Sequence, residues 1–205
     1  LLIDSEGLSV EAWRATLADY GVTMTDADIN EMLGLRIDED AALLIQRYTL
    51  PTTIADLANA KTERMITLVR THLKPMPGAV ELLVWLEAHD MPRALATSGL
   101  SEYARECLVA VGLNEAFTVR VTGDAVKQGK PAPDIFLLAA EQLKISPPRC
   151  LVLEDAPNGV AAAVAAQMPV IGIPNDHTRQ LHFPPVTAQA GSLFDVLTWL
   201  ESAAS

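Results

Sequence analysis

The chain has 205 residues, of which 50% are hydrophobic and 20% are charged, and its formal net charge is −11 at pH 7. This length allows one large domain or a core with a small insert, and the apolar content excludes a disordered or fibrous protein. Nucleic acid is excluded as an expected partner, because its binding normally requires a basic patch and no run of Lys and Arg occurs. We also expect neither a signal peptide nor a membrane span.

Cys107 and Cys150 are the two cysteines, and both stand in apolar surroundings. Two distant cysteines make a poor disulfide framework, so we expect reduced, buried thiols and a cytoplasmic protein. We expect a monomer or a weak homo-oligomer with no membrane or nucleic-acid partner.

Residues 5–74 have a helical pattern. Trp13, Leu17 and Tyr20 are spaced i, i+4, i+7, and apolar residues between positions 41 and 48 repeat this spacing. Thr25 precedes two aspartates, which is typical of a helix start. We predict a small helical bundle without strands.

From Pro75 onward, short apolar strands alternate with helices. This alternation predicts an α/β fold with a doubly wound parallel sheet, in which ligands bind beyond the carboxyl ends of the strands. We predict strands at 93–97, 117–121, 150–153, 170–173 and 186–188, and helices at 77–89, from after 99 to 111, and at 131–143, 159–167 and 193–200.

Polar residues follow several of these strands. Thr97, Ser98 and Gly99 lie between a strand and a helix, where a hydroxyl group, backbone N–H groups and a helix N-terminus could hold a phosphate. An ordinary helix N-cap is the alternative for these three residues.

Lys130 stands in the segment Gly-Lys-Pro-Ala-Pro-Asp, whose prolines stiffen the turn and could let Pro131 open the next helix. A lysine held in this way could neutralise a phosphoryl oxygen. The alternative is a solvated loop lysine, which is how we interpret Lys127.

Glu154 and Asp155 directly follow an apolar strand. Two adjacent carboxylates repel each other unless a cation lies between them, and hard oxygen ligands beside a phosphate favour Mg²⁺. Asp155 could instead act as a simple N-cap for the following helix.

Together these segments resemble the haloacid dehalogenase superfamily, close to its β-phosphoglucomutase-like branch. ALATSG at 94–99, GKPAPDIF at 129–136 and LVLEDAPNG at 151–159 are similar to the second, third and fourth motifs of that family, in order. The resemblance implies a core at 75–205 and a helical cap at 5–74. It also implies that Thr97 holds the transferring phosphoryl group, that Lys130 neutralises charge, and that Glu154 and Asp155 bind Mg²⁺. We expect Ser98 and Gly99, in the phosphate-holding segment after the strand, to bind substrate.

The sequence departs from the family pattern at its start. Members of the family open with a strand ending in Asp-x-Asp-Gly, and residues 1–4 resemble the remnant that follows it, so both catalytic aspartates would precede Leu1. We expect the chain as it stands to be inactive and to bind Mg²⁺ weakly or not at all. Because the missing strand should be central in the sheet, we favour an incomplete sequence over a true pseudoenzyme.

The expected activity is hydrolysis of a small phosphorylated metabolite, with a sugar phosphate favoured. Ser9 aligns where β-phosphoglucomutases carry an acid/base histidine, which favours a phosphatase over a mutase. Arg36 could contact substrate oxygens through its planar guanidinium group, or it could form a salt bridge with Asp40. A phosphosugar mutase and a non-catalytic phosphometabolite-binding protein are the alternatives.

Overall fold

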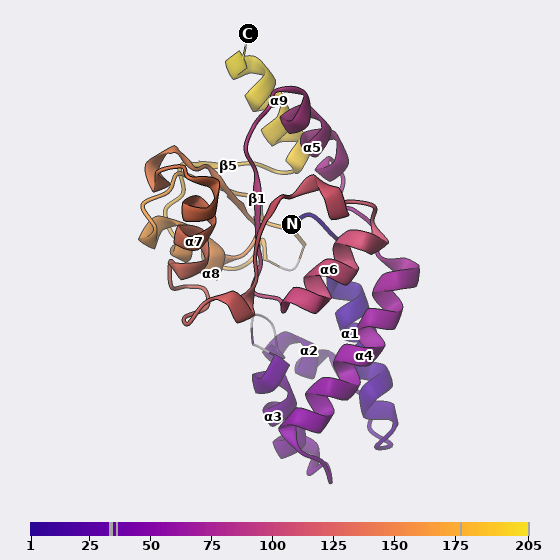
Figure 1. Ribbon diagram of the computed structural model, residues 1–205. Coiled ribbons are helices and arrows are strands. Elements are labelled where there is room, and N and C mark those ends of the chain that lie inside the picture. The colour runs from indigo at the N-terminus through magenta and orange to yellow at the C-terminus, as the bar shows by residue number, and fades with distance from the viewer. Residues whose placement is uncertain (33–34, 36, 177, 205) are drawn as a thin grey trace. The chain divides into compact units, whose positions relative to one another are not determined.

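The computed structural model describes residues 1–32, 35, 37–176 and 178–204. The chain divides into two compact units, which we call the core unit (Leu1–Ile3 and Pro75–Ser205) and the helical unit (Asp4–Lys74). Figure 1 shows the helices and strands of both units along the chain. No helix in the described part of the chain is both long enough and apolar enough to cross a membrane.

The helical unit contains helices and, over its described residues, no strand, as predicted. Its helices are α1 (Glu6–Ala18), α2 (Asp26–Met32), α3 (Ile37–Tyr48) and α4 (Ile54–His72). Apolar side chains from all four helices pack into one core, because their helical spacing puts them on one face of each helix. The buried members of this core are Trp13, Leu17, Met24, Met32, Ala41, Leu44, Leu50 and Leu57.

Asp28 anchors helix α2 although its side chain is fully buried. The carboxylate accepts hydrogen bonds from the backbone N–H and the hydroxyl of Thr25, and from the hydroxyl of Tyr48 at 2.6 Å. Arg47 adds an ion pair at 2.5 Å. Burial raises the pKa of Asp28, but the hydrogen bonds outweigh burial and hold that pKa well below its usual range. The expected helix start at Thr25 is therefore confirmed, with Asp28 as its main polar contact.

Asp40 is the second buried carboxylate of the helical unit, with 9% of its surface exposed. Burial raises its pKa to about 6, although Lys61 and a hydrogen bond with Trp13 act in the opposite direction. Its Oδ1 atom has no hydrogen-bond partner among the described residues. The ammonium of Lys61 lies 5.8 Å from the centre of the Trp13 ring.

The five strands described in the core unit pair in parallel, as predicted, and a single antiparallel bridge joins Ile3 and Pro75. β1 (Ala94–Ala96) pairs with β2 (Val119–Val121), and β3 (Val152–Glu154) pairs with β4 (Val170–Gly172), which pairs with β5 (Ala188–Gln189). These strands form two ladders, one of two strands and one of three, and no backbone ladder joins them within the described chain.

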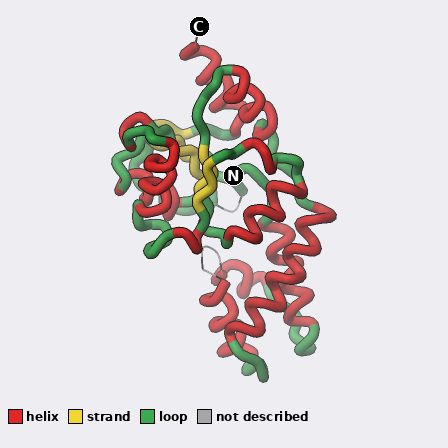
Figure 2. Tube along the Cα trace, viewed as in Figure 1, coloured by secondary structure: helices red, strands yellow, loops and turns green. Residues whose placement is uncertain are grey.

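Helices cover both faces of these strands (Figure 2). On one face α7 (Asp134–Leu143) and α8 (Pro157–Ala165) pack on residues of both ladders, including Val121 and Val170. On the other face lie α5 (Ala79–Ala88), α6 (Ser101–Ala110) and α9 (Leu193–Ala204). Short 3₁₀ turns occur at Asn114–Ala116, Gly123–Ala125 and Pro147–Arg149. The two ladders therefore share one core even though their backbones are not paired.

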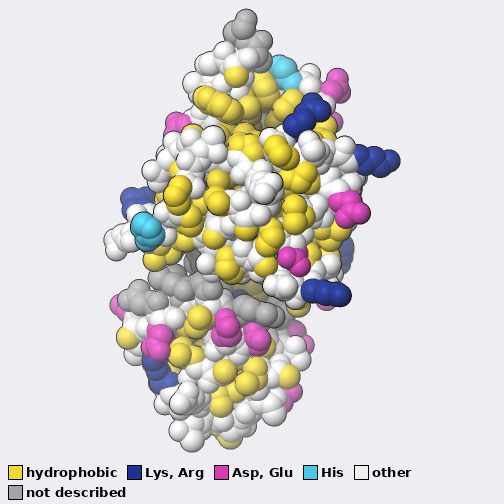
Figure 3. All heavy atoms as spheres, turned by 90° about the vertical axis from the view of Figure 1, so that its left-hand side faces the viewer, with side chains coloured by type: hydrophobic (Ala, Val, Ile, Leu, Met, Phe, Trp, Pro, Cys, Tyr) yellow, Lys and Arg dark blue, Asp and Glu magenta, His cyan; other side chains and the backbone are white. Residues whose placement is uncertain are grey.

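The structure tests the expected start of helix α7, the expected state of the two cysteines and the distribution of basic side chains. Pro131 does not open helix α7, which begins at Asp134 after Pro133 as N-cap, because residues 129–132 form a separate turn closed by the Ala132 N–H on the Gly129 carbonyl. Cys107 and Cys150 are free thiols, as expected, but only Cys107 is buried whereas Cys150 is half-buried; burial raises the pKa of both. On the face shown in Figure 3, Lys and Arg side chains are scattered and form no basic patch among the coloured residues.

Candidate active site

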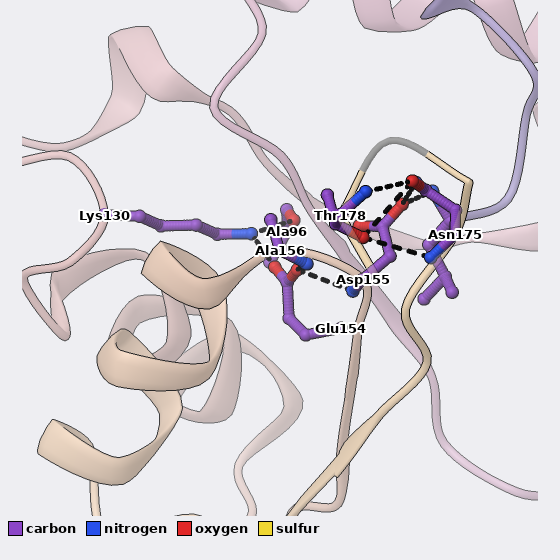
Figure 4. A network of polar contacts seen from close by, with 8 residues as sticks. Ala96, Lys130, Glu154, Asp155, Ala156, Asn175 and Thr178 are labelled. Carbon is purple, nitrogen blue, oxygen red and sulfur yellow. Dashed lines mark hydrogen bonds and ion pairs between the residues drawn. The ribbon is translucent and has the colours of Figure 1, made fainter. Parts of the chain in front are cut away.

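Lys130 joins the two ladders at their carboxyl ends. Its ammonium lies 3.4 Å from the carbonyl oxygen of Ala96, the last residue of β1, and forms an ion pair with Glu154, the last residue of β3 (Figure 4). The Lys130 side chain is only 12% exposed, and its ammonium also lies 4.9 Å from the centre of the Phe136 ring. The alternative of a solvated loop lysine is therefore wrong.

Glu154 is buried and points toward Lys130. Its Oε2 atom accepts hydrogen bonds from the backbone N–H groups of Asp155 at 3.1 Å and Ala156 at 3.4 Å. Since Ala156 is the N-cap residue of α8 and makes no side-chain cap, the Glu154 carboxylate binds the amides at this helix start instead. The positive end of the helix dipole stabilises a carboxylate at this place.

Gly159 leaves the space that the Glu154 carboxylate fills. A Cβ atom at position 159 would lie 2.1 Å from Cδ of Glu154 and 2.2 and 2.4 Å from its two oxygens. Atoms that are not bonded to each other do not approach so closely, so the glycine in the segment LVLEDAPNG has a packing reason in this structure.

Asp155 points away from Lys130 (Figure 4). Its Oδ2 atom lies 2.7 Å from the nitrogen of Leu1 and accepts a hydrogen bond from Asn175 at 3.1 Å. Successive residues at a strand end point in opposite directions, which explains why the two adjacent carboxylates separate. Because Ala156 is the N-cap of α8, the interpretation of Asp155 as a simple N-cap is wrong.

Thr97, Ser98 and Gly99 form a turn directly after β1. The Thr97 N–H donates to the carbonyl of Val121 at 3.0 Å, and the Thr97 hydroxyl accepts from the Gly99 N–H at 3.2 Å. The N-cap residue of α6 is Leu100, so the alternative that these three residues are an ordinary N-cap is wrong.

Two residues beyond β2 support this turn. Gly123 donates its N–H to the Gly99 carbonyl at 2.9 Å, and a Cβ atom on Gly123 would lie 2.3 Å from the carbonyl oxygen of Ser98. Asp124 accepts from the N–H and the hydroxyl of Ser101, the first residue of α6. Hydrogen bonds from Thr122 and Ser101 lower the pKa of Asp124, which keeps this carboxylate ionised as an acceptor.

The structure brings together only part of the predicted site. Thr97, Lys130, Glu154 and Asp155 all lie at the carboxyl ends of β1 and β3. Arg36 lies outside the described residues, so its contact with substrate stays a prediction. Asn175 and Thr178 were not predicted. Asn175 follows β4 closely, and the rule that polar residues after parallel strands gather at one edge could have found it.

The oxygen donors of Glu154 and Asp155 suit a hard cation such as Mg²⁺. Within the described chain, however, no group of three or more His, Cys, Asp or Glu side chains is placed to hold a metal ion. Asp155 Oδ1 makes no hydrogen bond to a described residue, whereas both oxygens of Glu154 already accept hydrogen bonds. Of the two carboxylates, Asp155 therefore fits the cation better.

Parallel strands between two layers of helices define an α/β protein, and a lysine and two carboxylates lie at the carboxyl ends of these strands. The sequence profile of the haloacid dehalogenase-like hydrolases matches residues 1–173, and the chain belongs to this family. The predicted fold class, an α/β core with a helical cap, is confirmed by this match and by a solved relative. CbbY from Rhodobacter sphaeroides in complex with phosphate superimposes with a TM-score of 0.86 at 28% identity, covering 95% of this chain and 91% of that one.

Several relatives carry phosphatase names. The chain is 34% identical over 203 residues to the probable pseudouridine-5′-phosphatase of Drosophila melanogaster, covering 95% of this chain and 87% of the relative. It is 32% identical over 175 residues to the fructose-1-phosphate phosphatase YqaB of Escherichia coli, covering 84% and 90%. It is also 34% identical over 196 residues to the bifunctional riboflavin kinase/FMN phosphatase of Arabidopsis thaliana, but it spans only 52% of that protein.

Proposed function

We propose that this protein is a Mg²⁺-dependent phosphatase that hydrolyses a small phosphate monoester, with a sugar phosphate as the favoured substrate. The observation that carries the proposal is the position of Lys130, a nearly buried ammonium held by Glu154 and Ala96 at the carboxyl ends of two parallel strands. The phosphatase names of the relatives and the phosphate bound by CbbY support the same chemistry.

In this proposal Lys130 and the residues around it each contact the phosphoryl group in a different way. The Lys130 ammonium neutralises charge on the phosphoryl oxygens, and it acts without reorganisation because Glu154 and Ala96 already hold it. The Thr97 hydroxyl and backbone groups of Ser98 and Gly99 hold the same oxygens. The close approach of Gly123 to Ser98 keeps this turn in place.

Asp155 would hold Mg²⁺ through Oδ1. Glu154 would be the second carboxylate beside the ion. When bound, the ion would supply positive charge that stabilises the transferring phosphoryl group. Mg²⁺ usually keeps several waters and few protein ligands, so a site with one available carboxylate is compatible with it. Its other protein ligand would come from residues before Leu1.

The nucleophile in this proposal is an aspartate upstream of Leu1. The nitrogen of Leu1 lies 2.7 Å from Asp155, so a preceding residue would be attached beside the acidic pair. Leu2 packs in one cluster with Leu95 of β1 and in another with Leu153 of β3. This position supports a preceding strand between the two ladders.

The reaction would then proceed in two displacements at phosphorus. The aspartate carboxylate attacks phosphorus, and the ester oxygen leaves as an alcohol after taking a proton from the second aspartate. Water, deprotonated by that second aspartate, then attacks the phosphorus of the acyl phosphate, which frees inorganic phosphate and restores the carboxylate. Covalent catalysis of this kind replaces one difficult step with two easier ones.

A phosphosugar mutase is the second candidate, because the motifs also resemble the β-phosphoglucomutase-like branch. Ser9 argues against it, since a serine hydroxyl cannot act as acid and base at neutral pH as a histidine can. In a mutase the phosphoenzyme would transfer its phosphoryl group back to a sugar hydroxyl and not to water.

The test is a screen of the protein as its gene encodes it against phosphorylated sugars, polyols and nucleosides, with and without Mg²⁺. We expect Mg²⁺-dependent release of inorganic phosphate. A parallel reaction contains a hexose 1-phosphate and a bisphosphate primer. Isomerisation faster than phosphate release would show that the protein is a mutase and not a phosphatase. Binding of these compounds without turnover would support a non-catalytic binding protein.

A further inference from the structure

The loop after β4 reaches the acidic edge of the site. The side-chain amide of Asn175 donates a hydrogen bond to Asp155 Oδ2 at 3.1 Å, although the two residues are 20 positions apart in the chain (Figure 4). Both side chains are partly buried. Among the described residues of this loop, Asn175 contacts the carboxylate best placed to bind a cation.

Thr178 holds the Asn175 side chain from the other end (Figure 4). Asn175 Oδ1 accepts from the Thr178 N–H at 3.0 Å and from the Thr178 hydroxyl at 3.2 Å. The Thr178 hydroxyl in turn accepts from the Asn175 N–H at 3.0 Å. The two hydrogen bonds to Oδ1 fix where the Asn175 amide points, and the backbone contacts between the two residues hold the turn.

The chemistry at both ends determines which way round the amide lies. The Thr178 backbone N–H can only donate, so it must face the oxygen of the Asn175 amide. The ionised Asp155 carboxylate can only accept, so it must face the NH₂ group. Reversing the amide would put two donors together at one end and two acceptors at the other. The Asn175 amide is therefore locked in the orientation that donates to Asp155.

We propose that Asn175, held by Thr178, is a positioning residue that orients the Asp155 carboxylate for Mg²⁺. The inference rests on the proposed function, because it assigns a purpose to the metal ligand of that site. Asn175 shares Oδ2 with the nitrogen of Leu1, and its hydrogen bond helps to set the rotation of the carboxylate that leaves Oδ1 available. An amide performs this task without adding a positive charge that would repel the cation.

The experiment measures Mg²⁺ binding directly, by calorimetry, and Mn²⁺ binding by electron paramagnetic resonance, on the protein as its gene encodes it. Loss of an outer-sphere partner of a metal ligand typically weakens metal binding 10- to 100-fold, so we expect a loss on the order of tenfold or more in Asn175→Ala. At saturating Mg²⁺ we expect kcat and KM for substrate to return close to the wild-type values, since the ligand itself is still present. A damaged fold would not be restored by Mg²⁺.

Thr178→Val tests the chain of contacts without touching Asp155. It removes the hydroxyl that both donates to and accepts from Asn175, so we expect a smaller loss of Mg²⁺ affinity. Because Thr178 acts through Asn175, the double variant should bind Mg²⁺ no more weakly than Asn175→Ala alone. Additive losses in the double variant would contradict this order of action.

Asp176→Asn is the matched control, because it is isosteric, lies in the same loop and alters a side chain that is 83% exposed and paired with Arg179. It should leave Mg²⁺ affinity unchanged. Asp155→Asn separates the two proposals. If it abolishes Mg²⁺ binding while Asn175→Ala has wild-type affinity, the positioning role is wrong and the metal site stands. If wild-type protein binds no Mg²⁺, or Asp155→Asn binds it normally, both proposals are wrong.

Discussion

Gly159→Ala probes the packing on which the position of Lys130 depends. The added Cβ atom would lie 2.1 to 2.4 Å from the Glu154 carboxylate, so the carboxylate must move by about 1 Å or more to reach ordinary contact distance. That movement breaks its hydrogen bonds with Lys130 and with the amides of Asp155 and Ala156. Helical alanine offsets part of this loss, because alanine is favoured over glycine by about 1 kcal/mol in a helix.

The expected net effect follows from these contributions. Leaving buried polar groups unsatisfied costs about 1 to 3 kcal/mol for each group. Three such groups lose their hydrogen bonds, so we expect Gly159→Ala to lower the free energy of unfolding by at least about 2 kcal/mol after the gain in helix propensity. Displacing Lys130 by about 1 Å should lower kcat/KM on the order of 100-fold.

Urea unfolding followed by circular dichroism measures the stability, and phosphate release measures the activity. Gly7→Ala is the matched control: it lies in helix α1, and an added Cβ atom there meets nothing within 4 Å. It should be neutral or slightly stabilising. If Gly159→Ala is as stable and as active as Gly7→Ala, the carboxylate of Glu154 does not occupy the space over Gly159.

Three further predictions concern the turn after β1 and the helical unit. Gly123→Ala puts a Cβ atom 2.3 Å from the backbone oxygen of Ser98, so it should lower both stability and kcat/KM, as urea unfolding and phosphate release will show. Asp28→Ala leaves Arg47 and Tyr48 without their buried partner and should cost about 3 kcal/mol in urea unfolding, whereas Asp26→Ala, at a side chain 96% exposed, should cost almost nothing. The raised pKa of Asp40 means that the native state favours the neutral carboxyl group. Its contribution to stability is therefore complete below about pH 4 and is lost as the pH rises through about 6. Urea unfolding should show that the free energy of unfolding of the wild-type protein decreases by about 2 to 3 kcal/mol from pH 4 to 7 through this group. Asp40→Asn should lack this decrease, and a variant with the same pH profile as the wild-type protein would refute the assignment.

The fold was largely predictable because the spacing of apolar residues in the sequence follows the periods of its helices and strands. Apolar residues at helical spacing predicted the helical unit, and short apolar runs between helices predicted parallel strands. Helix boundaries were less accurate: Pro131 suits a helix start, but the turn at residues 129–132 delays α7 to Asp134. Apolar spacing also does not show where the buried face of a terminal helix ends: Trp199, in the last helix, is 54% exposed.

The site was predictable only as far as strand ends determine it. Thr97, Lys130, Glu154 and Asp155 follow strands or a rigid turn, and the topology of a parallel sheet brings them together. The opposite directions of Glu154 and Asp155 depend on side-chain packing against Gly159 and on Asn175. The contact with Asn175 joins residues that are distant in the chain, and the contact over Gly159 depends on the absence of a side chain from glycine. Neither contact produces a local pattern in the sequence.

Mg²⁺-dependent phosphate release by Lys130→Ala, compared with Lys127→Ala, tests the central claim most directly. Both substitutions remove one lysine from the same loop, but Lys127 is exposed whereas Lys130 is held between β1 and β3. We predict that Lys127→Ala keeps the wild-type kcat/KM and that Lys130→Ala loses on the order of 100-fold or more. Equal activity of the two variants, with both folded, would contradict the assignment of this sheet edge as the phosphoryl-transfer site.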